Sequence, residues 1–228
     1  MKKLLLLLFT SHALMADTLP SIITTTVKSI DKNNHIQLAS SGLKGMNGIV
    51  VHEYGNKLSA ITHSVIVQEG NQAKIVDYTD IPHENIPNIQ TDVQVGDKVI
   101  LGAFYNNAMV LAPDAKTYAK ITNMYKKTWI HPDAYALDFM MNQQSAINLD
   151  NLETFAKANQ VGLILIADKD NLLILDPLSK KFLGQTAFSS ETSTAMSPFF
   201  ARFKQLDVSI FGISDIVYTP YYQAIKEL

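Results

Sequence analysis

Apolar and polar residues alternate along much of the first half of the chain, with the two-residue period of half-buried β-strands. Residues 24–30 are rich in β-branched side chains, residues 31–34 have the composition of a turn, and residues 35–38 alternate again, which predicts a hairpin. Further strands are predicted at 48–53, 59–68, 73–78, 98–104 and 108–111, with turn-forming segments between them. Many short strands of this kind are typical of a small barrel or a sandwich.

The period changes after Pro113, where apolar residues begin to recur every three or four positions, as on one face of a helix. Asp114 can cap a first helix, and Pro132 fits the first position of a second. Either Asn148 or Asp150 can cap a third. The pattern therefore predicts three consecutive helices.

Short apolar strands follow the helices, at residues 163–167, 172–176 and 182–188, and turn-forming segments join them into a meander. A last helical segment is expected from about residue 214, with an interruption at Pro220. The predicted fold class is therefore α+β. A β-rich barrel or sandwich at 17–112 is followed by a mixed helix and β-meander half at 113–228, and both halves together form the folded protein.

The N-terminus has the pattern of a secretory signal peptide over residues 1–16. Two lysines precede an apolar run, and small residues follow it, so cleavage is expected after Ala16, with Ala13 as the alternative. The apolar run is much shorter than the roughly 20 residues that a membrane-spanning helix needs. We therefore expect an exported protein, in the periplasm or on the outer surface, whose mature chain has no membrane span.

Composition narrows the possible partners. The chain has no cysteine, which excludes disulfides and a lipid-modified cysteine, so the fold depends on its own core. It carries 19 basic and 21 acidic residues, and Arg202 is its one arginine. Nucleic-acid binding relies on excess positive charge and often on several arginines, so nucleic acid is not an expected partner.

Two short motifs resemble known functional elements. Ser41 and Lys44 have the Ser-x-x-Lys spacing of a serine nucleophile and its lysine base, but they lie between predicted strands, next to Gly42, and a loop is the favoured interpretation. His131-Pro132-Asp133 matches the tripeptide of J-domain co-chaperones, yet Pro and Asp at a helix start are ordinary capping chemistry. We therefore expect no catalytic residues and no enzyme activity.

Candidate metal ligands are few. His52 and His63 would be cross-strand neighbours if a hairpin joins them, but the sequence offers no third ligand at zinc-site spacing. Asp168, Asp170 and Asp176 form a loose carboxylate cluster in positions where hairpins favour turn-formers, with a weak cation site as the alternative. No metal and no cofactor are expected.

The most unusual stretch is 192–203, where a polar run leads into three phenylalanines and Arg202. These rings either pack beneath a sheet or form an exposed adhesive patch, and packing is favoured because aromatic side chains are usually buried. Arg202 is expected to pair with a buried carboxylate.

Several motifs occur along the chain in a fixed order. They are Gly-Met-Asn-Gly-Ile-Val-Val at 45–51, Gly-Asp-Lys-Val at 96–99, the Phe-x-Asn-Asn-Ala-x-x-x-Ala-Pro stretch at 104–113, Ser-Pro-Phe-Phe-Ala-Arg at 197–202 and Tyr-Tyr-Gln-Ala at 221–224. In these motifs the chain resembles the N-terminal domain of the bacterial plasminogen-binding protein A family, over nearly all of the mature length. The signature residues are Asn106, Asn107, Pro113, Pro198, Phe199, Phe200 and Arg202.

This resemblance implies a non-enzymatic exported protein that binds host plasminogen at the bacterial envelope. It also implies a lysine mechanism, because plasminogen kringles hold a lysine ammonium together with a nearby carboxylate. Family members known for the activity carry a charged tail that ends in lysine, whereas this sequence ends Lys-Glu-Leu, so internal lysines are the expected ligands. The alternative is a periplasmic envelope-assembly or protein-binding module with an envelope protein as partner. The candidate binding residues are Lys126, Lys127, Lys180, Lys181 and Lys226.

Overall fold

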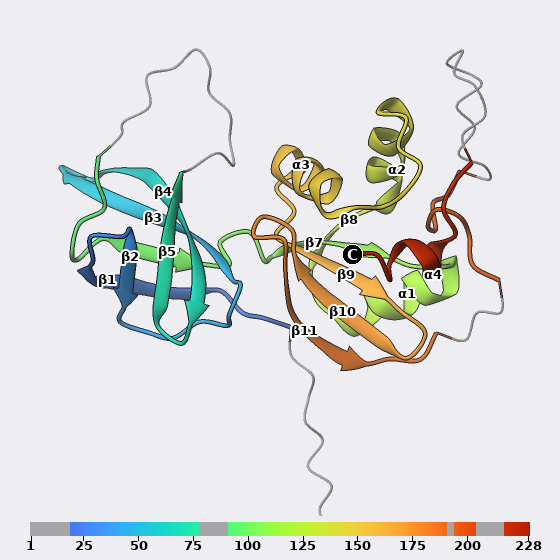
Figure 1. Ribbon diagram of the computed structural model, residues 1–228, viewed down its shortest axis with the longest axis horizontal. Helices are drawn as coiled ribbons and strands as arrows, with labels where there is room; N and C mark the ends of the chain where they lie inside the picture. Colours follow the sequence, from blue (N-terminus) through green and yellow to red (C-terminus); the bar gives the residue numbers. More distant parts are fainter. Residues whose placement is uncertain (1–18, 78–90, 191–193, 204–216) are drawn as a thin grey trace, which may run out of the picture.

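The computed structural model describes residues 19–77, 91–190, 194–203 and 217–228 (Figure 1). These residues form a closed six-stranded barrel and a separate five-stranded sheet with helices packed around it. The predicted α+β fold is confirmed, and of the two β architectures left open the first half adopts the barrel. The predicted signal peptide and the first part of the predicted last helix lie outside the described residues.

The barrel is built entirely from antiparallel neighbours in the order β1-β2-β5-β4-β3-β6, closed by pairing of β1 with β6. Its interior is filled by apolar side chains such as Val50, Val65 and Val99, all fully buried. The strands are β1 (Ile23–Ile30), β2 (His35–Leu38), β3 (Asn47–Gly55), β4 (Leu58–Glu69), β5 (Gln72–Asp77) and β6 (Lys98–Leu101).

The predicted barrel strands are found at their expected places, with one shorter than expected. β6 ends at Leu101 instead of residue 104, because Gly102 turns the chain with a φ of +66°. A Cβ at Gly102 would lie 2.5 Å from the Tyr105 ring, so glycine is needed for both the backbone conformation and the close packing.

The second sheet has the order β11-β10-β9-β7-β8, with β7 parallel to β8 and β9 and the other neighbours antiparallel. β9 to β11 form the predicted meander, whereas the short β8 was not predicted, because three residues show no clear period. The strands are β7 (Asn107–Leu111), β8 (Thr128–Ile130), β9 (Leu163–Ala167), β10 (Asn171–Asp176) and β11 (Lys181–Ala187).

β7 lies in the second sheet, although the sequence pattern grouped it with the strands of the first half. Its residues alternate between two cores: Ala108 and Val110 pack in the cluster that continues into the barrel, and Met109 and Leu111 pack on the opposite face. A strand covered on both faces is a continuous apolar run, and such a run does not reveal which sheet it joins.

Helices cover both faces of this sheet. Asp114 caps α1 by accepting a hydrogen bond from the Thr117 amide, Pro132 takes the first position of α2, and Asn148 caps α3, as predicted. None of the helices in the described residues is long and apolar enough to cross a membrane. The helices are α1 (Ala115–Met124), α2 (Pro132–Met141), α3 (Leu149–Asn159) and α4 (Tyr221–Ala224).

α1 packs in the core shared with the barrel through Ile121, while α2, α3 and α4 cover the other face. That second core is rich in aromatic rings, among them Tyr135, Phe139 and Phe155. The start and the end of the second half both pack at this sheet. β7 belongs to it, and α4, near the C-terminus, packs against it (Figure 1).

Candidate functional site

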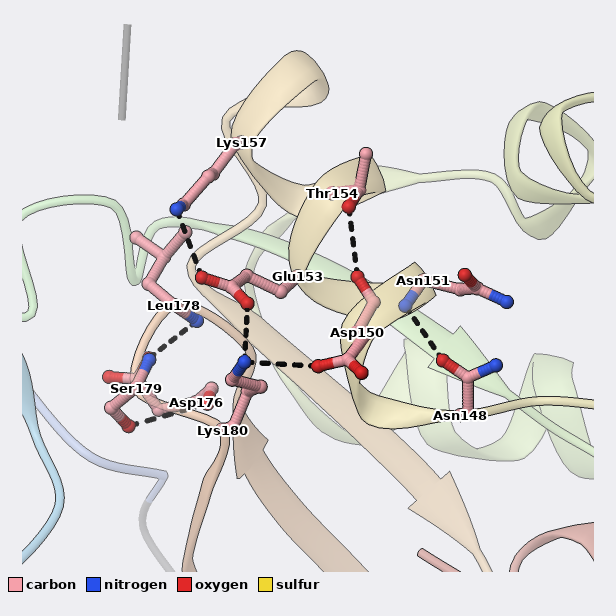
Figure 2. A network of polar contacts seen from close by, with 10 residues as sticks. All are labelled: Asn148, Asp150, Asn151, Glu153, Thr154, Lys157, Asp176, Leu178, Ser179 and Lys180. Atoms are coloured by element: carbon pink, nitrogen blue, oxygen red, sulfur yellow. Dashed lines mark hydrogen bonds and ion pairs between the residues drawn. The ribbon is translucent and has the colours of Figure 1, made fainter. Parts of the chain in front are cut away.

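A mixed-charge surface lies where the turn after β10 meets the first turns of α3 (Figure 2). The turn is shaped by Asp176, whose Oδ1 accepts hydrogen bonds from the backbone amides of Leu178 at 3.0 Å and Ser179 at 3.1 Å. The following residue, Lys180, has a left-handed φ of +55°. This local geometry directs the Lys180 side chain toward α3 (Figure 2).

Lys180 bridges two carboxylates of α3. Its Nζ lies 3.0 Å from Asp150 Oδ1 and 2.8 Å from Glu153 Oε2. The other carboxylate oxygen of Glu153 is 2.9 Å from Nζ of Lys157, one helical turn further on. Two ammonium groups and two carboxylates thus share one surface, which we call the α3 charge network (Asp150, Glu153, Lys157 and Lys180).

The α3 charge network is accessible but unevenly so. The Asp150 side chain is 84% exposed, that of Lys180 39% and that of Glu153 21%. Partial burial acts to raise the pKa of Glu153, but hydrogen bonds from Lys180 and Lys157 outweigh it and hold that pKa below its ordinary value. The hydrogen bonds that Lys180 donates to Glu153 and Asp150 raise the pKa of Lys180. Glu153 and Lys180 are therefore both charged at neutral pH.

The other candidate lysines have different surroundings. Lys181, the first residue of β11, is exposed beside Lys180, and Lys126 and Lys226 are exposed elsewhere. Lys127 is half-buried, its Nζ donates a 2.7 Å hydrogen bond to the Tyr105 carbonyl, and burial lowers its pKa. The candidate lysines fall into three groups along the chain: residues 126–127, residues 180–181 and Lys226. No described contact joins one of these groups to another.

The α3 charge network can hold a charged ligand by exchange of partners. An exposed ion pair is worth roughly 0–1 kcal/mol, so an incoming acidic group can take Lys180 from Asp150 at little cost. The carboxylates that Lys180 leaves stay close to it and remain available to a cationic group of the same ligand. The network suits recognition of a partner that itself carries both charges.

Arg202 pairs with a largely buried carboxylate, as predicted, and the partner is Asp133. The Arg202 backbone amide donates to Asp133 Oδ1 at 2.8 Å, and Nε donates to Oδ2 at 2.5 Å. Burial acts to raise the pKa of Asp133, but the hydrogen bonds from Arg202 and the nearby His131 leave it below its ordinary value. This pair fastens the 197–202 segment to the start of α2.

The phenylalanines of that segment pack, as favoured above. Phe199 stacks on Tyr135 with ring centres 5.2 Å apart, and Phe200 lies 5.5 Å from the Tyr118 ring. Phe203 is 37% exposed at the end of the described segment. The adhesive-patch interpretation therefore fails for Phe199 and Phe200, which are buried.

The other signature residues hold the two ends of β7. At its start, the Asn106 carbonyl accepts a hydrogen bond from the Thr128 amide, and the Asn107 side chain donates to the Gln160 carbonyl. At its end, the Pro113 carbonyl accepts a hydrogen bond from the amide of Met196, two residues before Pro198. The contacts of these residues are architectural.

The two motifs resembling known functional elements lie in a loop and at a helix start. Ser41 and Lys44 lie in the loop between β2 and β3, without the helix that their proposed chemistry requires. His131 caps α2, its Nδ1 accepting a 3.1 Å hydrogen bond from the Asp133 amide, with Pro132 at the first helical position. The capping interpretation of the His-Pro-Asp tripeptide is confirmed.

The histidine and aspartate candidates form no metal centre among the described residues. In the β3–β4 register His63 lies opposite Val50, while His52 lies opposite Ala60, so the hairpin exists but does not pair the two histidines. His52 is instead 2.7 Å from Asp97 Oδ1 through Nδ1.

Two of the three aspartates occupy a turn, and the third is far from it. Asp168 and Asp170 lie between β9 and β10, whereas Asp176 lies at the opposite end of β10. Asp176 is fully buried, and its Oδ2 accepts hydrogen bonds from the Tyr105 hydroxyl at 2.6 Å and the Asn47 amide at 2.8 Å. Burial raises its pKa.

Sequence reasoning missed Asp150 and Glu153 as partners of Lys180. A signal was present, because acidic residues at i and i+3 on a helix share one face, and Lys157 continues that face. The sequence does not indicate that the β10–β11 turn lies against that face of α3.

A family model described as "Plasminogen-binding protein pgbA N-terminal" matches residues 22–226 of the chain. This range includes both sheets and all four helices described above. No curated protein and no solved structure matches the chain.

Proposed function

The chain belongs to the family of plasminogen-binding protein pgbA N-terminal domains, and on that premise we propose that it is a non-enzymatic protein that binds host plasminogen at the bacterial envelope through exposed lysines. The observation that carries the proposal is the α3 charge network, in which Lys180 lies within 3.0 Å of two carboxylates.

The chemistry of this surface matches the ligand expected for a kringle. A kringle takes a lysine ammonium and a carboxylate together, and Lys180 with Glu153 or Asp150 offers both groups on neighbouring elements. Exposed Lys181 supplies a second ammonium next to Lys180. We therefore assign the binding role to Lys180 and Lys181, with Asp150 and Glu153 as the accompanying carboxylates.

The remaining candidate lysines have lesser parts in this proposal. Lys127 is engaged with the Tyr105 carbonyl and serves the fold. Lys126 and Lys226 are exposed, but neither has an ion pair among the described contacts, so the proposal gives them no specific part in binding.

An exported location follows from the same proposal, because a protein sealed inside the cell does not meet plasminogen. The signal-peptide pattern at residues 1–16 supports export. The alternative role, a protein-binding module that assists envelope assembly from the periplasm, requires export but no surface display. Protease treatment of intact cells separates the two, since a surface protein is degraded and a periplasmic one is protected.

The direct test is binding of purified plasminogen to the purified chain by surface plasmon resonance, with and without a saturating lysine analogue such as 6-aminohexanoic acid. The proposal predicts binding that the analogue abolishes, because the analogue fills the kringle sites. Binding that persists in saturating analogue contradicts the lysine mechanism, and absence of any binding contradicts the proposed function.

A further inference from the structure

A cavity of about 440 Å³ lies where the barrel meets the second sheet. This volume falls within the roughly 300–1,000 Å³ that ligand pockets span. No charged side chain is among its lining residues, and apolar atoms from both halves of the chain dominate it. Its main apolar contributors are Leu19, Ile23, Leu43, Met46, Ile174 and Leu183.

One wall of the cavity is an edge strand. β11 is the last strand of its sheet, and β10 is its one neighbour among the described strands. Residues 183–186 of β11 line the cavity. An edge strand presents backbone N–H and C=O groups that an added strand can pair with, and an apolar pocket beside it receives alternate side chains of that strand.

The cavity also has an apolar rim, and two lysines, Lys44 and Lys181, lie close along the chain to its lining residues Leu43 and Leu183. Leu43 lines it while remaining 46% exposed. At the start of β11, Lys181 packs against the loop that holds Lys44: a Cβ at Gly45 would lie 2.7 Å from the Lys181 Cβ and 3.5 Å from Leu183 Cδ2. Both lysines are exposed. An apolar groove with positive charge at one end complements an apolar segment that carries an acidic group.

We propose that this groove binds an extended segment of a partner protein, which adds to the sheet along β11, places apolar side chains in the cavity and sets an acidic group beside Lys44 and Lys181. The groove shares Lys181 with the surface to which plasminogen binding is assigned, but the inference does not rest on plasminogen binding, because it is argued from the cavity and the edge strand. It concerns a second ligand class, an apolar and acidic peptide without lysine.

Gly184 offers a way to block the groove without disturbing the fold. It lines the cavity, and a Cβ added there would meet no atom within 4 Å. Gly184→Trp therefore fills the open space with a ring. Ser59→Trp, at an exposed position of β4 outside the cavity, is the matched control for adding a large aromatic side chain.

The probe is a synthetic peptide in which leucine alternates with threonine and the last residue is glutamate. Titrated into the isotope-labelled chain, it is expected to shift backbone amide signals of β11 and of residues 43–46. Gly184→Trp should weaken binding at least tenfold, and Ser59→Trp should leave it unchanged. No shifts at millimolar peptide, or shifts that Gly184→Trp does not diminish, would overturn the proposal.

The basic end is tested separately. Lys44→Glu combined with Lys181→Glu should weaken binding of the same peptide at least fivefold, and Lys32→Glu, in the exposed β1–β2 turn, should not. A peptide that ends in lysine instead of glutamate should bind the double variant more tightly than it binds the unmodified chain. Equal binding of both peptides would contradict the assigned acidic group.

A second copy of the chain is the competing occupant of β11. Sedimentation velocity of the unmodified chain distinguishes it: a monomer at tens of micromolar leaves the edge free for the partner segment. A dimer that Gly184→Trp dissociates would instead assign the groove to self-association and overturn the proposal.

Discussion

The hydroxyl of Tyr105 donates a 2.6 Å hydrogen bond to the buried carboxylate of Asp176, and this contact joins the segment after the barrel to the far end of β10. The same carboxylate accepts hydrogen bonds from the Asn47 amide of β3 and from the amides of Leu178 and Ser179. One side chain therefore holds the barrel, the connection to the second sheet and the turn that presents Lys180.

Substitution of Asp176 should strongly destabilise the protein. In Asp176→Asn the amide nitrogen cannot accept, so some of the hydrogen bonds to the carboxylate are lost and donors are left buried without a partner. We expect a loss of about 2–4 kcal/mol in the free energy of unfolding, measured by urea denaturation. Tyr105→Phe removes a single hydrogen bond and should cost less, about 1–2 kcal/mol. Equal stability of Asp176→Asn and the unmodified chain would refute the role of this joint.

Because Asp133 pairs with Arg202, we expect the protein to lose stability toward unfolding at acidic pH. Because the pKa of Asp133 in the folded protein is below its ordinary value of 3.8, the folded state favours the ionised form. The stabilisation is fully present above pH 3.8 and disappears as the pH falls through the lowered pKa. In urea denaturation measured between pH 6 and pH 2, Asp133→Asn should be less stable at pH 6 and should lose less stability toward pH 2. A parallel pH dependence of the two proteins would show that this pair contributes nothing.

Gly162 should tolerate no side chain. A Cβ there would lie 2.3 Å from the Phe104 carbonyl carbon and 2.7 Å from the Tyr105 nitrogen, and backbone atoms cannot move aside cheaply. Gly162→Ala should destabilise by about 3 kcal/mol. Gly184→Ala is the matched control, since its Cβ meets open space, and its thermal midpoint should stay within a degree or two of the unmodified value. A neutral Gly162→Ala would contradict this packing.

Lys127 is expected to stabilise the fold and to have no part in plasminogen binding. Lys127→Ala removes the hydrogen bond from Nζ to the Tyr105 carbonyl and should cost about 1 kcal/mol in unfolding free energy. Plasminogen binding by the folded variant should be unchanged. Lys126→Ala, at the exposed neighbouring position, should change neither quantity. Loss of plasminogen binding in Lys127→Ala with stability intact would reverse this assignment.

Local features of the fold could be predicted from the sequence, because their causes are local. The Asp114 and Asn148 caps, Pro132 at a helix start and the β1–β2 hairpin each depend on residues a few positions apart. Long-range pairing could not. β7 pairs in parallel with β9, and an apolar run in the sequence does not indicate which strand it will pair with.

The candidate site shows the same limit. The existence of a carboxylate partner for Arg202 could be predicted from the isolation of one arginine among aromatic residues, but its identity, Asp133, lies 69 residues away. Asp176 was interpreted as a turn residue, which is correct for its Oδ1 contacts. Its burial against Tyr105 depends on how the barrel packs against the second sheet, and no local sequence pattern indicates that packing.

The most direct test of the central claim is the plasminogen affinity of the double variant Lys180→Ala, Lys181→Ala, compared with that of Lys28→Ala, Lys32→Ala. Both variants lose two positive charges, but Lys28 and Lys32 lie on the barrel, away from the α3 charge network. We expect at least a tenfold loss of affinity for the first variant and unchanged affinity for the second. Equal affinities of the two variants would contradict the assignment of plasminogen binding to this surface.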